Sequence, residues 1–257
     1  MKTILIANQK GGIGKTTTAT AIASILRNKN KKVLFIDADP QGNSTDTYRA
    51  DTGDGVATLY DVILERDEPI NINEAIQHTQ AGDIIASDRL LMDADKILNG
   101  DVDGFYKLKD AISELSDYDY LVIDTAPSLN SLLFNCLIAA DDIIIPITAD
   151  KYGFQGLSQL NDSIIKVRKR FNPNLKIAGL LLVKYNERTI LARDVKKTLV
   201  KIAEQIDTKV FNTFIRESVK VREAQTMRQL LIDYDPKCTS SIDYMNLVEE
   251  YITNFNK

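Results

Sequence analysis

The 257-residue sequence predicts an α/β domain with a doubly wound, mostly parallel sheet and helices on both faces. Two observations support this fold. Short runs rich in Ile, Leu and Val alternate with longer helical patterns, which is the order of strand–helix–strand units. Several of these runs are apolar throughout rather than at every second position, as in parallel strands covered on both faces. We expect a single domain over residues 1–257.

Strands and helices are expected to alternate over the whole length. The strand candidates are residues 3–8, 32–37, 83–87, 120–125, 142–147, 177–183 and 209–215. The helix candidates are residues 15–29, 104–116, 129–140, 154–171, 189–205, 217–231 and 240–255. Residues 43–82 contain Gly53, Gly55 and Pro69 and show the least regular pattern, so we expect this segment to decorate the sheet.

Composition excludes several kinds of site. His78 is the only histidine, which removes histidine-based zinc sites and Ser-His-Asp triads. Cys136 and Cys238 are too few and too far apart for a disulfide framework or a four-cysteine metal site. The first apolar run, Ile4 to Ala7, is too short for a signal peptide or a membrane span, so we expect a cytoplasmic protein.

The net charge of −4 averages over segments of opposite sign. Residues 37–124 carry six basic and 21 acidic side chains, whereas residues 166–228 carry sixteen basic and six acidic ones. Many of the basic residues in the second segment follow one another at three- or four-residue spacing, so they share helix faces. An acidic protein with one basic segment suits contact with a polyanion through one face.

The strongest motif is QKGGIGKTTT, Gln9 to Thr18, which lies between the first expected strand and the first expected helix. A helix N-terminus at this place presents unpaired backbone N–H groups and a positive dipole end to an anion. Its glycines let the backbone approach phosphate oxygens closely. Lys15 is expected to reach the β- and γ-phosphates, and the Thr16 hydroxyl to bind Mg²⁺. The expected nucleotide-binding residues are Lys10, Gly11, Gly12, Ile13, Gly14, Lys15, Thr16 and Thr17.

This motif departs from the ordinary Walker A pattern, because Gln9 stands in place of a glycine and a second lysine, Lys10, precedes the paired glycines. KGGIGKTT is the deviant Walker A signature. Through it the chain resembles the ParA-type partition ATPases, a group of P-loop NTPases related to MinD-type ATPases and nitrogenase iron proteins. The resemblance implies ATP as the nucleotide and a homodimer in which Lys10 crosses the interface to the partner's phosphates. A cation there would stabilise concentrated negative charge.

Two aspartates end the second expected strand, in FIDADPQGN. Carboxylates at the carboxyl ends of strands face the ligand crevice of open α/β sheets. Asp37 and Asp39 leave opposite sides of an extended chain. The family resemblance implies that Asp39 orients the attacking water, that Asp37 lies near Mg²⁺, and that residues 40–42 form a switch segment. Together with Lys10 and Lys15, Asp39 completes the expected catalytic set.

A third aspartate ends the run YLVIDTAP, Tyr120 to Pro127, which is the Walker B candidate. Four apolar residues deliver Asp124 to the crevice, where it can hold Mg²⁺ through water. The expected metal-binding residues are therefore Thr16, Asp37 and Asp124. The following residues resemble the second switch of the family, with Ser128 where the family commonly has a second proline.

The basic segment is the expected DNA-binding region. Lys and Arg contacts to phosphates give sequence-independent, salt-sensitive binding. The resemblance implies that the ATP-bound dimer binds DNA non-specifically, and Arg188 and Lys220 match positions of the family tied to DNA contact. For any single basic residue, a solvated helix face is the alternative interpretation.

Taken with the resemblance, the motifs predict an ATPase for DNA partition that is nucleoid-associated and stimulated by a ParB-like centromere-binding partner. The phosphate loop begins about ten residues into the chain, so we expect no N-terminal helix-turn-helix domain. The alternative is a MinD-type ATPase that acts at a membrane surface. The expected last helix has an apolar stripe, but its polar side carries Asp243, Glu249 and Glu250, which anionic lipid would repel. We therefore expect no membrane partner.

Overall fold

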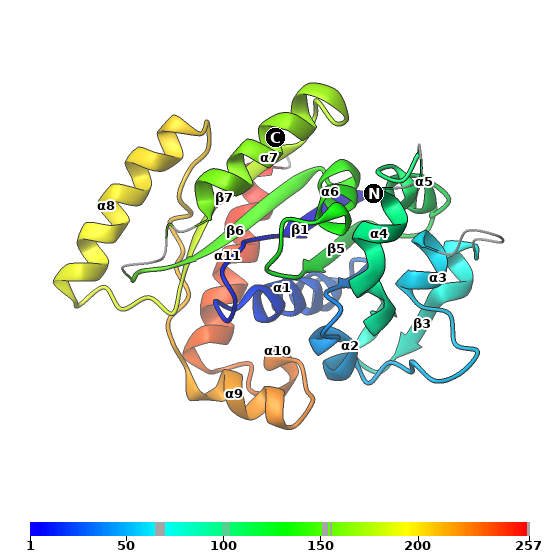
Figure 1. Cartoon of the computed structure of the whole chain (residues 1–257). Coiled ribbons are helices and arrows are strands. Elements are labelled where there is room, and N and C mark those ends of the chain that lie inside the picture. Colours follow the sequence, from blue (N-terminus) through cyan, green and yellow to red (C-terminus); the bar gives the residue numbers. More distant parts are fainter. Residues whose placement is uncertain (65–69, 100, 102, 151–153, 155, 256–257) are drawn as a thin grey trace.

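The sheet of the computed structural model has the strand order β3-β4-β2-β5-β1-β6-β7 (Figure 1). The structure describes residues 1–64, 70–99, 101, 103–150, 154 and 156–255. Among them the strands are β1 Lys2–Ile6, β2 Val33–Ala38, β3 Ile76–Thr79, β4 Gly82–Ile85, β5 Tyr120–Thr125, β6 Asp142–Thr148 and β7 Lys176–Val183. All neighbours pair in parallel except the edge strand β3, which runs antiparallel to β4. The predicted fold class is confirmed.

Helices cover both faces of this sheet (Figure 1). The longer ones are α1 Lys15–Asn28, α6 Ser131–Ala139, α7 Leu157–Arg170, α8 Ile190–Gln205, α9 Val219–Thr226 and α11 Thr239–Phe255. The shorter ones are α2 Asn43–Tyr48, α3 Leu59–Ile63, α4 Ala94–Leu98, α5 Lys107–Ser113 and α10 Leu231–Tyr234, with 3₁₀ turns at Ile72–Ala75 and Arg89–Asp93.

Alternate residues of each central strand enter two separate apolar cores. Leu5 of β1 packs in a core with α3 and α5 to α8, whereas Ile4 and Ile6 pack in a second core with α1, α10 and α11. All three side chains are fully buried, because both faces of the sheet are covered. This arrangement explains the runs without polar alternation, and it leaves the carboxyl ends of the strands as the open edge of the sheet.

Two expected elements differ from the structure. Residues 209–215 do not form a continuous strand, because they pair with β7 only at two isolated bridges, Leu180 with Val210 and Val183 with Ile215. The expected helix 217–231 ends at Thr226, since Arg228 has a left-handed backbone (φ 51°) and the chain restarts as α10. The irregular segment 43–82 contains helices and the edge strand β3, which sequence pattern alone did not identify.

Gly179→Ala is expected to lower the free energy of unfolding by about 1–3 kcal/mol. A Cβ at this position of β7 would lie 2.6 Å from the ring of Phe211, and that ring is fully buried. Urea unfolding followed by circular dichroism measures the change. Gly53→Ala, in an exposed loop, is the control and should leave the unfolding midpoint unchanged. Equal midpoints for wild type and Gly179→Ala would contradict the packing of residues 209–215 on β7.

Candidate nucleotide-binding site

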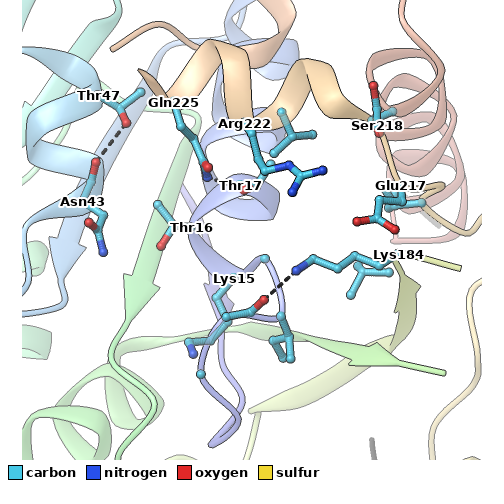
Figure 2. Close-up of a pocket in the computed structure, with 18 of the residues that line it drawn as sticks. Lys15, Thr16, Thr17, Asn43, Thr47, Lys184, Glu217, Ser218, Arg222 and Gln225 are labelled. Carbon is cyan, nitrogen blue, oxygen red and sulfur yellow. Dashed lines mark hydrogen bonds between the residues drawn. The ribbon is translucent and has the colours of Figure 1, made fainter. Parts of the chain in front are cut away.

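A cavity of about 630 Å³ lies at the carboxyl ends of β1, β2, β5 and β7. Its floor is the phosphate loop and the start of α1, and α9 lies over it (Figure 2). The expected residues that line it are Gly11, Gly12, Ile13, Gly14, Lys15, Thr16, Thr17 and Asp39. Ligand crevices of open α/β sheets occur at this edge. The structure thus brings the predicted loop and Asp39 together.

The phosphate loop is shaped by two glycines with left-handed backbones, Gly12 (φ 68°) and Gly14 (φ 97°). Residues with a Cβ are strained in this region, which explains the glycines. Gly14 precedes the first turn of α1, and no side chain caps that turn. No acidic residue lies in it either. The first N–H groups of α1 and its positive dipole end are therefore directed to the cavity, as an anion requires.

Lys15 is nearly buried, and its Nζ donates to the backbone oxygen of Lys10 at 3.2 Å. Burial lowers the pKa of the ammonium group, while the nearby carboxylates of Asp124 and Asp39 act in the opposite direction. The group therefore lies in a poorly solvated place beside two acids. A charge in such a place interacts more strongly with a phosphate than it would in water.

Lys10 is not one of the residues that line this cavity. Its Nζ contacts both carboxylate oxygens of Asp150, at 2.6 and 2.8 Å, and the hydroxyl of Thr148 at 2.9 Å. Both partners lie at or just beyond the carboxyl end of β6. The second lysine of the motif thus points to the neighbouring strand end, whereas Lys15 points to the cavity.

The parallel register of β2 and β5 sets Asp37 opposite Asp124, and both side chains are fully buried. Burial is the main cause that raises both pKa values, to about 6 for Asp37 and about 7 for Asp124. Hydrogen bonds lower both pKa values in opposition to burial. Asp37 accepts them from Thr45 and the backbone of Asp39, and Asp124 accepts them from the hydroxyls of Thr16 and Ser44. Two buried carboxylates on paired strands favour a bound cation or proton.

Asp124 fits a Mg²⁺ site. Its Oδ2 accepts a hydrogen bond from Ser44 at 2.9 Å, but its buried Oδ1 has no hydrogen-bond partner among the residues that the structure describes. The hydroxyl of Thr16 is close enough to lower its pKa, which gives an all-oxygen set of the kind Mg²⁺ prefers. Among the described residues no group of three or more His, Cys, Asp or Glu is placed to hold a metal. Mg²⁺ usually binds through one or two carboxylates and keeps water and phosphate ligands.

Asp37 has a different setting from Asp124. One oxygen accepts from the backbone N–H and the hydroxyl of Thr45, at 2.7 and 2.8 Å, and the other from the backbone N–H of Asp39 at 3.1 Å. These bonds anchor the start of α2 to the end of β2. Asp37 remains a predicted neighbour of Mg²⁺, and its observed contacts position the segment that carries Asp39.

Asp39 is held in place by its backbone as well as its side chain. Its Oδ1 accepts from the N–H of Gln41 at 2.9 Å, and its carbonyl accepts from the hydroxyl of Ser87 at 2.5 Å. Ser87 in turn donates its N–H to Thr45, so the same network includes α2. The carboxylate lines the cavity near Lys15, which is where a group that orients a water molecule has to lie.

Sequence reasoning missed the residues of the cavity that come from the C-terminal third. Lys184, at the end of β7, has a left-handed backbone and donates its Nζ to the carbonyl of Gly12 at 2.8 Å (Figure 2). From α9, Gln225 donates to the hydroxyl of Thr17 at 3.3 Å, and from α11 the hydroxyl of Tyr244 meets that of Thr18 at 3.0 Å. Lys184 belongs to the basic segment, but its charge alone does not say which way it points.

The two predicted DNA contacts differ in their surroundings. Arg188 is exposed in the turn that leads into α8. Lys220 forms an ion pair with Glu223 at 2.8 Å, and its Nζ lies 5.9 Å from the ring centre of Tyr234. Neither residue lines the cavity, and they lie on different elements.

The fold and the site define a P-loop ATPase with an uncapped helix N-terminus and a buried lysine. The model of a family described as "AAA domain" matches residues 1–177. The chromosome partitioning protein ParA of Caulobacter vibrioides is 35% identical over 257 residues, which covers 98% of this chain and 94% of that protein. The sporulation initiation inhibitor protein Soj of Bacillus subtilis is 34% identical over 254 residues, with coverage of 98% and 99%.

Solved structures agree with these relatives. An ATP complex of McdA from Cyanothece has a TM-score of 0.87 and 26% identity, over 98% of this chain and 96% of that one. A putative plasmid partition protein of Borrelia burgdorferi bound to AMPPNP has a TM-score of 0.80 and 28% identity, over 99% of both chains. Cobyrinic acid a,c-diamide synthase of Mycobacterium smegmatis, with an ATP analogue and magnesium, has a TM-score of 0.84 and 28% identity, over 100% and 97%.

The chain belongs to the ParA-type family of partition ATPases, as the deviant phosphate loop predicted. It is an ATPase whose cofactors are ATP and Mg²⁺. Within the part of the chain that the structure describes, no helix has the length and apolar character needed to span a bilayer.

Asp124→Asn is expected to stabilise the protein at pH 8 when Mg²⁺ and nucleotide are absent. The folded-state pKa of Asp124 is raised to about 7 from 3.8, so the folded protein holds the proton more tightly and its stability falls as pH rises between these values. Asparagine cannot ionise, so the variant does not lose stability in this pH range. Each kcal/mol of unfolding free energy regained raises Tm by roughly 2–4 °C. Thermal unfolding at pH 5 and pH 8 measures it.

The same variant should lose Mg²⁺-dependent ATP hydrolysis by at least about tenfold, since the unpaired oxygen is replaced. Asp54→Asn, which removes an exposed loop carboxylate, is the control and should change neither property. A variant that is less stable than wild type at pH 8 would contradict the raised pKa.

Proposed function

We propose that the chain is the ATPase of a DNA-partition system in which ATP closes a homodimer that binds DNA non-specifically. Hydrolysis, stimulated by a ParB-like centromere-binding partner, releases the dimer from DNA. Residues 1–257 act as one ATPase domain, and the protein associates with the nucleoid through this DNA binding. The observation that carries the proposal is the placement of the two lysines of the deviant loop.

Lys10 and Lys15 belong to one short loop but point to different places. Lys15 lines the cavity of its own subunit, whereas Lys10 is turned to Asp150 and Thr148 outside it. The ion pair with Asp150 is partly exposed, and such pairs contribute only about 0–1 kcal/mol. A phosphate group of a second subunit is a stronger partner for a lysine in a site from which water is excluded. This supports a role for Lys10 across a dimer interface.

The chemistry of hydrolysis follows from the charges around the cavity. Lys15 and the N–H groups of α1 hold the phosphates, and Asp124 with Thr16 holds Mg²⁺, which neutralises charge that develops in phosphoryl transfer. Asp39 accepts a hydrogen bond from the attacking water and orients it. We expect slow hydrolysis in the isolated protein, because a partner that closes or completes the site then sets the rate.

The proposed DNA surface centres on Arg188 and the exposed face of α8. Buried Ala192, Val195 and Leu199 attach this helix to the domain, so its opposite face points outward. Arg193 and Lys197 are exposed on that outer face, one helical turn apart. Arg188 is exposed, whereas Lys220 has to leave Glu223 before it can contact DNA. We therefore rank Arg188 above Lys220.

The MinD-type alternative is not favoured by α11. Tyr244, Leu247 and Tyr251 of this helix are buried against α1 and the sheet. Its acidic residues are bound to the domain as well, since Asp243 pairs with Arg216 and Glu250 accepts from the backbone of Asn212 and Thr213. The helix therefore packs on the domain and does not offer its apolar side to lipid.

Arg188→Ala is expected to weaken DNA binding in the presence of ATP by roughly three- to tenfold and to reduce the salt slope of log K by about 1, because one phosphate contact is lost. Fluorescence anisotropy with DNA of unrelated sequences, across a salt series, measures both. Lys220→Ala should have the smaller effect, since its ammonium group is already paired. Lys15→Ala, which loses ATP, is the negative control. DNA affinity that is the same with ATP, with ADP and without nucleotide would overturn the proposal.

Asp39→Ala is expected to retain ATP but to hydrolyse it on the order of 100-fold more slowly, because the attacking water loses its orienting group. The ATP-bound dimer should then persist on size-exclusion chromatography in Mg²⁺, where wild type returns to monomer as ATP is consumed. Asp51→Ala, at an exposed loop outside the cavity, is the matched control. Wild-type turnover in Asp39→Ala would remove this residue from the mechanism.

A further inference from the structure

Helix α9 presents two different faces to its surroundings. Lys220 and Glu223 form an ion pair, and Glu223 also accepts a hydrogen bond from the hydroxyl of Tyr234 at 3.0 Å. Arg222 and Gln225, three residues apart and so on one face of the helix, line the nucleotide cavity instead. Figure 2 shows both side chains extending from α9 toward the start of α1.

The contact of Gln225 identifies which end of the cavity α9 covers. Its amide donates to the hydroxyl of Thr17 at 3.3 Å. In a phosphate loop the lysine, here Lys15, serves the β- and γ-phosphates and the next hydroxyl, here Thr16, serves Mg²⁺. Thr17 lies one residue further into α1, beyond the residues that serve the β- and γ-phosphates and Mg²⁺. The pocket-facing side of α9 therefore covers the part of the phosphate chain that lies away from the γ-phosphate.

The guanidinium of Arg222 differs from its basic neighbours, because none of the acidic residues that the structure describes is paired with it. Arg216 pairs with Asp243, Lys220 with Glu223, and Arg228 with Asp46. Over the described ranges no carboxylate lies within ion-pair distance of Arg222. The side chain is exposed to the solvent of the cavity, so its five donors are free to bind an anion there.

We propose that Arg222 is a nucleotide-binding residue that donates hydrogen bonds to the α-phosphate of the nucleotide held in its own subunit. A guanidinium matches the spacing of two phosphate oxygens, which a single ammonium group does not. The α-phosphate is common to ATP and ADP. Arg222 therefore strengthens the binding of both nucleotides alike, in contrast to a residue that contacts the γ-phosphate and distinguishes them.

A second cation of the cavity lining, Lys184, already has a partner in the protein. Lys184 donates to the carbonyl of Gly12, near the opposite end of the loop from Thr17. Its charge supports the loop backbone there, while Arg222 faces the helix end of the same loop. The two cations thus act at different ends of the bound nucleotide, and only Arg222 is assigned to the α-phosphate.

The test compares the Kd of Mg·ADP and of a Mg²⁺ complex of a non-hydrolysable ATP analogue, by isothermal titration calorimetry. Arg222→Gln is expected to raise both Kd values by about tenfold, the loss of one charge-assisted hydrogen bond. Arg222→Lys should recover part of the affinity, since the charge remains and the paired donors do not. Lys31→Gln, which removes an exposed cation outside the cavity, is the control and should bind both nucleotides as wild type does.

The melting temperature without nucleotide distinguishes a role in nucleotide binding from a role in stability alone. Arg222→Gln should leave this temperature unchanged because the side chain is exposed. Unchanged Kd values for both nucleotides would overturn the proposal. A loss confined to the ATP analogue would overturn it too, because it would place the guanidinium at the γ-phosphate. The result does not depend on DNA binding or partition, since ADP binding by the ATPase is measured directly.

Discussion

The site depends on two carboxylates that the parallel pairing of β2 and β5 places side by side in the buried interior. Asp37 and Asp124 are register partners and fully buried. Burial raises their pKa values and lowers that of Lys15, while the carboxylates of Asp124 and Asp39 act on the lysine in the opposite direction. A phosphate chain with Mg²⁺ brings further anionic groups and a cation into this site of low polarity, where each interacts more strongly than in water.

This constraint also explains how the segments around the cavity are connected. The carboxylate of Asp37 accepts hydrogen bonds from Thr45 and from the backbone of Asp39. The start of α2 and the segment after β2 are therefore fixed by the same carboxylate. Ser87, at the end of β4, joins this network through Thr45 and the carbonyl of Asp39. A change in charge at the buried pair therefore reaches the residue proposed to orient water through hydrogen bonds alone.

The sequence predicted those parts of the molecule that short segments determine. The apolar runs identified the parallel strands, and the spacing of glycines and lysines in residues 9–18 identified the loop. The break after Thr226 was not predictable in this way, because it depends on a left-handed backbone at Arg228, a residue without any turn preference. Residues 209–215 have strand-like composition, but their long-range pairing is limited to two bridges.

The direction of side chains was the other part that the sequence could not provide. Lys184 and Lys220 both belong to the basic segment. The first reaches Gly12 inside the cavity, and the second lies beside Glu223 and Tyr234. Charge counts place both residues in one class, whereas contacts between distant elements separate them. Arg188 is exposed in the turn before α8, and the match to a position of the family did not by itself predict this exposure.

The uncapped N-terminus of α1 affects the stability of the protein when no nucleotide is bound. Its first N–H groups lack a side-chain acceptor, because Gly14 stands at the N-cap, and a glycine cap is weaker than Ser, Thr, Asn or Asp by about a few tenths of a kcal/mol. A bound nucleotide supplies those acceptors, so the helix at the centre of the second core is completed by the ligand. Bound nucleotide therefore stabilises the folded protein. The nucleotide-free form unfolds more readily and is the form that proteases cleave more easily.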